Sequence, residues 1–308
     1  MQMKRYVFLG IVMLISSILL VACESDTASV PPPYLGGMDA LVADFERIGS
    51  VGEGRTGASV WEDESFPVAV EFKNRGEYTI PANKVEMNIR GISQNDFSGI
   101  DFTKDNTEEI MGATEYFPRG GEYYTHFGDA RYISGVSGSR HQVEVFVEFI
   151  YPYETYISIP QVCHSYDVRD HSVCRVDSMR QAFSSGGPLR VKSAEQMYIG
   201  RNKMQVVIEV EHIGRDWASM KARESDTFDD RYYKAYFEVD RPEWYCRSTG
   251  GETNVVRIPT EGDRTGVIRC EYDNLQEGDN HREALNFDLS YYYKDQISKE
   301  VIIKKPHS

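Results

Sequence analysis

The sequence predicts an all-β protein in which two tandem antiparallel β-sandwiches follow an N-terminal signal or anchor segment. Three observations lead to this prediction: apolar and polar residues alternate over several segments, helical periodicity is scarce, and two of the alternating patterns recur in the second half of the chain. The 308 residues are 41% hydrophobic and 27% charged, which is a globular composition. A chain of this length has room for about two domains of ordinary size.

Residues 1–22 have the features of an export signal. A short basic start, Lys4-Arg5, precedes an uncharged run over residues 6–22, which ends in Leu-Val-Ala before Cys23. This ending resembles the lipobox of prokaryotic lipoproteins. The resemblance implies that the thiol of Cys23 is lipidated and that Cys23 becomes the first residue of the mature chain.

The lipobox implies a lipid-anchored protein on the extracytoplasmic face of the cell membrane, which it contacts through the lipid on Cys23. The alternative is a single N-terminal transmembrane helix, because the run over residues 6–22 is 17 residues long, at the low end of what spans a bilayer. Both alternatives place residues 24–308 outside the cytoplasm. Residues 23–37 contain three consecutive prolines and a Gly-Gly pair, so we predict a tether, or a disordered start without a mechanical role.

The predicted strands are segments in which apolar side chains occupy every second position. This pattern gives one dry and one wet face, as in antiparallel sheets that pack on one side. The segments are residues 66–74, 85–89, 143–149, 206–210, 285–293 and 301–303.

Two of these patterns repeat at nearly equal offsets. The pattern from Val68 to Gly76 recurs 138 residues later, and the pattern from Val143 to Tyr151 recurs 142 residues later. We therefore predict two copies of one domain, residues 38–185 and residues 186–308, divided at a Ser-Ser-Gly-Gly-Pro segment. The alternative is convergent patterning, since any two sandwiches share such alternation.

The segment VAVEFKNRG (residues 68–76) resembles the immunoglobulin-like adhesion repeats of the CARDB type in surface proteins of archaea and bacteria. In those repeats an alternating strand ends in a turn built on Asn and Gly, and a Gly-Gly loop similar to FPRGG (residues 117–121) follows. The resemblance covers about residues 60–150 and is weaker in the second half, where His212 replaces the Asn. It implies immunoglobulin-like sandwiches with roles in adhesion, scaffolding or surface display, and no catalytic residues.

Four cysteines remain after Cys23, and an exported chain favours disulfides between them. We predict the pairs Cys163–Cys174 and Cys246–Cys270, because each joins residues within one half of the chain. Loops of this size give about 3 kcal/mol per disulfide by the loop-entropy estimate.

A zinc site is the alternative for the first cysteine pair. Cys163, His164, His171 and Cys174 offer two thiols and two imidazoles, which can hold zinc tetrahedrally. Neighbouring side chains on a strand point in opposite directions, however, and the usual zinc spacings are absent. We therefore predict a disulfide and no metal site.

No nucleophile elbow, zinc-protease motif, phosphate loop or dinucleotide fingerprint is present, so we predict no catalytic residues, no cofactor and no enzymatic activity. The acidic runs 224–230 and 273–280 are candidate calcium loops or ordinary solvated charge. The net charge of −14 argues against nucleic acid as a partner, because phosphate contacts need clustered Lys and Arg.

The chain contains 20 tyrosines, several of them adjacent. Exposed tyrosines are enriched in binding surfaces, although tyrosine is also a good strand former. The candidate binding residues are Tyr123, Tyr124, Tyr232, Tyr233 and Tyr292.

Together these features predict a non-enzymatic binding, adhesion or scaffold module whose partner is a protein or a glycan. The alternative is a structural subunit of an envelope assembly or surface filament, in which an edge strand such as residues 301–304 pairs with a neighbouring chain.

Overall fold

A computed structural model describes residues 30–51, 58–250 and 252–306. These residues contain strands and turns but no helix, and the all-β prediction is confirmed. No helix in the described part of the chain is both long and apolar enough to cross a membrane. The predicted export signal, the lipidation site Cys23 and the alternative transmembrane helix all lie outside the described residues.

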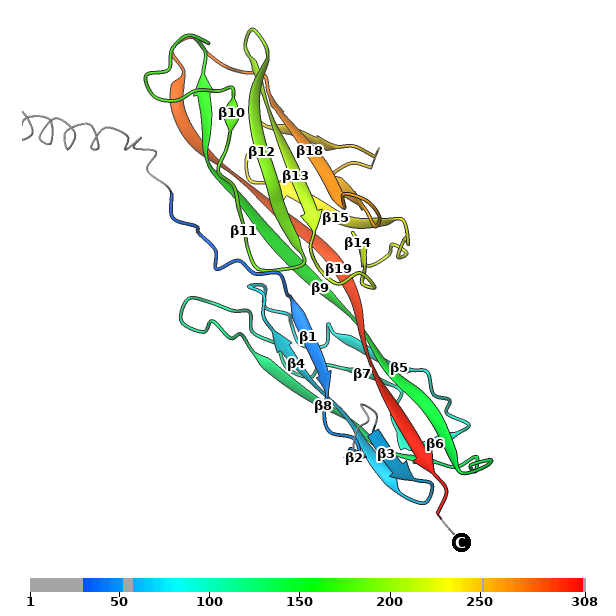
Figure 1. The fold of residues 1–308 in the computed structure, drawn as a ribbon. Helices are drawn as coiled ribbons and strands as arrows, with labels where there is room; N and C mark the ends of the chain where they lie inside the picture. Colours follow the sequence, from blue (N-terminus) through cyan, green and yellow to red (C-terminus); the bar gives the residue numbers. More distant parts are fainter. Residues whose placement is uncertain (1–29, 52–57, 251, 307–308) are drawn as a thin grey trace, which may run out of the picture. The chain divides into compact units, whose positions relative to one another are not determined.

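The strands form three sheets within one compact unit, Pro33–Ser308 (Figure 1). The four-stranded sheet has the order β1 (Leu41–Phe45), β4 (Ser65–Asn74), β8 (Glu122–Tyr132) and β6 (Phe97–Ile100). The five-stranded sheet has the order β10 (Ser178–Met179), β12 (Leu189–Gly200), β13 (Lys203–His212), β18 (Thr265–Tyr272) and β16 (Tyr245–Ser248).

The third and largest sheet joins strands from both ends of the chain. Its main path is β17 (Val255–Pro259), β15 (Tyr232–Val239), β19 (Asn280–Lys304), β9 (Arg140–Ser165), β5 (Glu86–Arg90) and β7 (Thr103–Asp105). Four short strands complete it: β11 (Phe183–Ser184) on β9, β14 (Ser219–Lys221) and β3 (Ala58–Trp61) on β19, and β2 (Ser50–Val51) on β3.

Alternating apolar side chains bury one face of each principal strand, as the sequence predicts. In β4 the side chains of Val68, Val70 and Phe72 are fully buried. Phe72 meets Phe149 of β9 edge to face, with ring centroids 5.2 Å apart, so the four-stranded sheet packs on the largest sheet. The five-stranded sheet packs on another part of it, where Gln196 of β12 exchanges hydrogen bonds with the backbone of Cys163.

The two long strands β9 and β19 pair along their entire lengths and form an antiparallel ribbon through both packing regions (Figure 1). Tyr151 and Tyr293, which the sequence repeat relates at an offset of 142, lie opposite each other in this ribbon with ring centroids 5.8 Å apart. Other residues related by the same offset do not face each other, since Val143 lies opposite Val301 and Leu285 lies opposite Ile159.

The end of β19 lies among strands of the first half of the chain. Val301–Lys304 pair with β9 on one side and with β3, in parallel, on the other. The prediction that residues 301–304 form a free edge strand is therefore wrong, because both of their backbone edges are already hydrogen-bonded. The predicted domain division between residues 185 and 186 stays a prediction, and strands from both sides of it share the largest sheet.

The last residues of the predicted tether contact the folded body. The carboxylate of Glu77 accepts hydrogen bonds from the backbone N–H of Gly36 (2.9 Å) and of Gly186 (2.7 Å). A Cβ on Gly186 would lie 2.8 Å from the carbonyl oxygen of Gly36, so this approach requires glycine. The hydroxyl of Tyr153 donates to the carbonyl of Gly186, which fixes the same segment to the ribbon.

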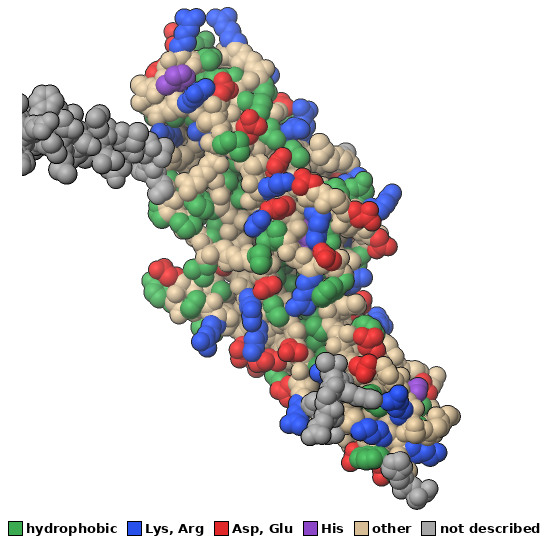
Figure 2. All heavy atoms as spheres, viewed as in Figure 1, with side chains coloured by type: hydrophobic (Ala, Val, Ile, Leu, Met, Phe, Trp, Pro, Cys, Tyr) green, Lys and Arg blue, Asp and Glu red, His purple; other side chains and the backbone are tan. Residues whose placement is uncertain are grey.

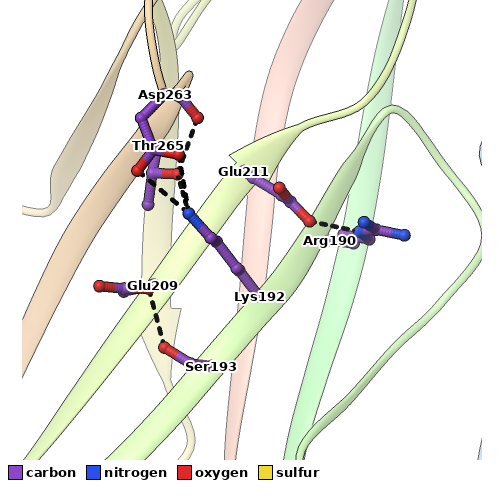
Figure 3. A network of polar contacts seen from close by, with 7 residues as sticks. All are labelled: Arg190, Lys192, Ser193, Glu209, Glu211, Asp263 and Thr265. Carbon is purple, nitrogen blue, oxygen red and sulfur yellow. Dashed lines mark hydrogen bonds and ion pairs between the residues drawn. The ribbon is translucent and has the colours of Figure 1, made fainter.

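Charged side chains of both signs are interspersed over the face drawn in Figure 2. On the five-stranded sheet they form a network in which Lys192 reaches Asp263 (2.8 Å) and Arg190 reaches Glu211 (Figure 3). These groups are solvent-accessible, and such pairs add little stability. We interpret the network as a solvated surface.

Candidate functional site

The five predicted tyrosines lie at two separate places in the fold. Tyr123 and Tyr124 begin β8 of the four-stranded sheet, whereas Tyr232, Tyr233 and Tyr292 lie on strands of the largest sheet. Tyr124 is 52% exposed. Tyr233 is only 2% exposed and stacks on His212 with ring centroids 3.9 Å apart, so its ring lies in the core rather than on a surface.

The hydroxyls of four of these tyrosines already have partners or charged neighbours, and that of Tyr233 accepts a hydrogen bond from the guanidinium of Arg264 (3.3 Å). Tyr123 accepts a hydrogen bond from the backbone N–H of Thr107 (3.2 Å), and Tyr292 donates to Glu224 (3.3 Å). Desolvation, and then the nearby Glu46 carboxylate, raise the pKa of Tyr124 above its ordinary value.

A loop that precedes β8 exposes more apolar surface than any of these tyrosines. We call residues 111–121 the tip loop. Tyr116 is 93% exposed, Met111 49% and Phe117 44%. Tyr124 lies three residues beyond the loop on β8, so the aromatic side chains here come from a short stretch of chain. The tip loop is the most concentrated group of large exposed apolar side chains within the described residues.

The tip loop has its own hydrogen-bonded structure. Thr114 and Phe117 exchange backbone hydrogen bonds of 3.1 and 3.0 Å, and the N–H of Gly121 donates to the carbonyl of Met111 (2.7 Å). Gly120 has a φ of +64°, and a Cβ there would lie 1.8 Å from the carbonyl oxygen of Asn74. Only glycine fits this conformation and this approach.

A buried asparagine fixes the base of the loop. The side chain of Asn74 is fully buried at the end of β4. Its amide donates to the carbonyls of Tyr78 (2.7 Å) and Ile110 (3.0 Å), and its oxygen accepts from the N–H of Gly76 (3.2 Å). This is the Asn of the Asn-x-Gly turn in the sequence, so one side chain joins that turn to the chain entering the tip loop.

Sequence reasoning missed the tip loop as a surface. The sequence used the FPRGG segment only for a family resemblance, because the exposure of Tyr116 and Phe117 and the contacts of Gly120 and Asn74 appear only in the folded structure. The Gly-Gly pair beside two aromatic residues is the signal that could have indicated a rigid exposed turn.

The structure contains both predicted disulfides, Cys163–Cys174 and Cys246–Cys270. The second joins residues that face each other on β16 and β18. Because both sulfur atoms of the first pair are in a disulfide, they are not available for the alternative zinc site, and His171 is exposed to solvent.

Carboxylates of the two acidic runs accept hydrogen bonds from backbone N–H groups close by in the sequence. Asp226 accepts a hydrogen bond from the N–H of Arg223 (3.0 Å), and Asp279 accepts one from the N–H of Gln276 (2.7 Å). Neither run gathers three metal ligands. Within residues 30–51, 58–250 and 252–306, one such group converges, and it consists of His164, His281 and Glu283.

Comparison with known proteins adds little. No family model and no curated protein matches the chain. Among solved structures, the chain is similar to the secreted serine protease VesC from Vibrio cholerae, with 11% identity over 82% of this chain and 50% of that chain and a TM-score of 0.22. The chain spans about half the length of that structure, and a TM-score this low carries no argument about fold or activity.

Proposed function

We propose that the chain is a lipid-anchored extracytoplasmic protein that acts as a non-enzymatic binding or adhesion module. In this proposal two immunoglobulin-like sandwiches present the tip loop to a protein or glycan partner, and the lipid on Cys23 ties the body to the membrane. The tether raises the local concentration of the body at the membrane, which strengthens binding to a partner in the same envelope.

The observation that carries this proposal is that Tyr116 and Phe117 are exposed on a loop whose backbone is held by hydrogen bonds. Large aromatic side chains at the centre of an interface supply much of its binding energy. A loop already fixed by Gly120 and Asn74 loses little conformational entropy on binding, which favours affinity. Elsewhere among the described residues, no short stretch of chain exposes a comparable group of large apolar side chains.

One further observation supports an exported location, and another relates the tip loop to the predicted tether. Both disulfides are of the kind that persist outside the reducing cytosol. The chain enters the body at Gly36, beside Glu77, and a Cβ on Gly112 of the tip loop would lie 2.3 Å from the carbonyl oxygen of Glu77. The tether and the tip loop therefore share a base.

The test is capture of partners from envelope extract with the full chain in detergent, followed by titration of each purified partner. We expect the double variant Tyr116→Ser, Phe117→Ser to bind at least tenfold more weakly than the wild type. Tyr245→Ser is the matched control, because Tyr245 is 67% exposed on β16 of the five-stranded sheet. Equal binding by all three proteins would refute a role for the tip loop.

The filament alternative predicts a different behaviour in solution. A chain that stays monomeric as its concentration rises supports the binding module. Fibres or large oligomers would favour the envelope subunit, which would need a strand other than residues 301–304 for pairing, because that segment is paired on both sides.

A further inference from the structure

Three potential metal ligands converge at the start of β19, close to Asn280, where the β9–β19 ribbon ends beside the Cys163–Cys174 disulfide. His164 of β9 and His281 of β19 face each other in the register of the ribbon, and Glu283 follows His281 on the same side of its strand. Their ligand atoms all lie within 4.8 Å of one another. The Nε2 atom of His164 is 3.5 Å from an oxygen of Glu283, and the two imidazoles stack with centroids 4.9 Å apart.

A β-bulge brings these residues together. Ile159 pairs with Leu285 and Val162 pairs with Glu283, so two residues of β9 stand opposite one residue of β19. The extra residue changes the alternation of β9, and His164 follows Val162 onto the buried side. Bulges commonly redirect side chains in this way next to functional sites. On β19 the alternation continues unchanged, so Glu283 and His281 extend the inward face of Leu285 to the open end of the sheet.

His164 is buried beside the other two ligands, and an oxygen of Glu283 lies 3.5 Å from its Nε2 atom. Its side chain is 2% exposed, and its Nε2 atom makes no hydrogen bond. The rings of Trp244 and Tyr272 meet it edge on, with centroids 5.8 and 4.8 Å away. A buried nitrogen of this kind calls for an explanation, and a bound ion supplies one.

The remaining ligands are positioned by their own neighbours. The other oxygen of Glu283 forms an ion pair with the guanidinium of Arg241 at 2.8 Å, which orients the carboxylate and leaves the first oxygen facing His164. The carbonyl oxygen of His281 lies 3.4 Å from the Cys174 sulfur, so the Cys163–Cys174 disulfide packs against the backbone of this ligand.

We propose that His164, His281 and Glu283 bind a zinc ion, with a fourth coordination position open to solvent beside the exposed His281. Two imidazoles and a carboxylate form a donor set that zinc uses in sites that keep an open position. Zinc–ligand distances of about 2.0–2.2 Å place tetrahedral ligand atoms roughly 3.5 Å apart. The widest separation here must therefore shorten on binding, and His281 can provide that movement because its side chain is exposed.

The test uses the full chain, purified in detergent, freed of metal with a chelator and titrated with zinc against a chromophoric competitor. We expect one zinc per chain, and cobalt substitution that gives the absorption bands of a four- or five-coordinate site. His281→Ala and Glu283→Gln should each weaken zinc binding at least tenfold. His171→Ala is the matched control, since this exposed histidine lies in the same half of the fold and should leave binding unchanged.

Trp244 provides a second readout beside its buried neighbour His164. Cobalt bound at this site should quench the part of the tryptophan fluorescence that Trp244→Phe removes. Absence of stoichiometric binding would overturn the proposal, and so would zinc binding that survives both His281→Ala and Glu283→Gln in folded protein. Loss of binding in His171→Ala alone would also overturn it, because it would assign the ion to another site.

Discussion

Replacing Asn74 with alanine should destabilise the protein strongly, because one buried side chain satisfies three backbone groups. The change removes two donated hydrogen bonds, to Tyr78 and Ile110, and one accepted from Gly76. Each buried group left without a partner costs about 1–3 kcal/mol. Taking values near the low end, we expect Asn74→Ala to lower the free energy of unfolding by about 3–5 kcal/mol, a large part of a typical domain stability of about 5–15 kcal/mol.

The assay is equilibrium unfolding in guanidinium chloride, followed by near-ultraviolet circular dichroism, with limited proteolysis as a local probe. Asn74→Ala should shift the midpoint and should also make the tip loop a cleavage site, because its base is no longer fixed. Asn95→Ala is the control, since Asn95 is exposed and its removal should change stability by no more than about 0.5 kcal/mol.

A shift of less than about 1 kcal/mol for Asn74→Ala would refute this reasoning. It would mean that the three backbone groups find other partners, and that the tip loop keeps its structure without the Asn74 amide. The loop would then lack the rigidity on which the proposed binding role depends.

Three other predictions follow from the buried groups of the fold. Burial, reinforced by Arg264, lowers the pKa of His212 to about 3 in the folded state, so the unfolded chain binds an extra proton once the pH falls below about 6.5. The free energy of unfolding should then fall by up to about 1.4 kcal/mol per pH unit between pH 6.5 and 3, and His212→Gln should remove this contribution. Urea titrations at several pH values measure it, and the same pH dependence in His212→Gln and the wild type would contradict the assignment. Replacing Cys246 and Cys270 with serine should cost about 3 kcal/mol in the same titrations, whereas no loss would show that the disulfide constrains the unfolded chain little. Because β9 and β19 run through both packing regions, calorimetry should show one cooperative transition, and two resolved transitions would show that the halves unfold separately.

Much of the fold could be predicted because alternation is a local property. The segments around Val68, Val145, Ile208 and Phe287 are strands with the expected buried faces. The pairing of strands is not local. Residues 285–293 and 301–303 look like two separate strands in the sequence, yet they form one strand, β19, whose end is held by β3 and β9. Alternation does not encode which neighbour covers each backbone edge.

The candidate sites were harder to predict for the same reason. His281 and Glu283 look like an ordinary polar strand end, and His164 reaches them only through the bulge opposite Leu285. The alternative zinc site considered from the sequence grouped His164 with Cys163, His171 and Cys174, but the two cysteines form the predicted disulfide. The disulfides themselves were predictable, since export and short separations left few sensible pairings.

Intact mass spectrometry of the protein extracted from its own membrane tests the central claim most directly. The proposal of a lipid-anchored surface module predicts a chain that begins at Cys23, carries lipid on that residue and holds Cys163, Cys174, Cys246 and Cys270 in two disulfides. A soluble chain that retains Met1, carries no lipid and has four reduced thiols would contradict it.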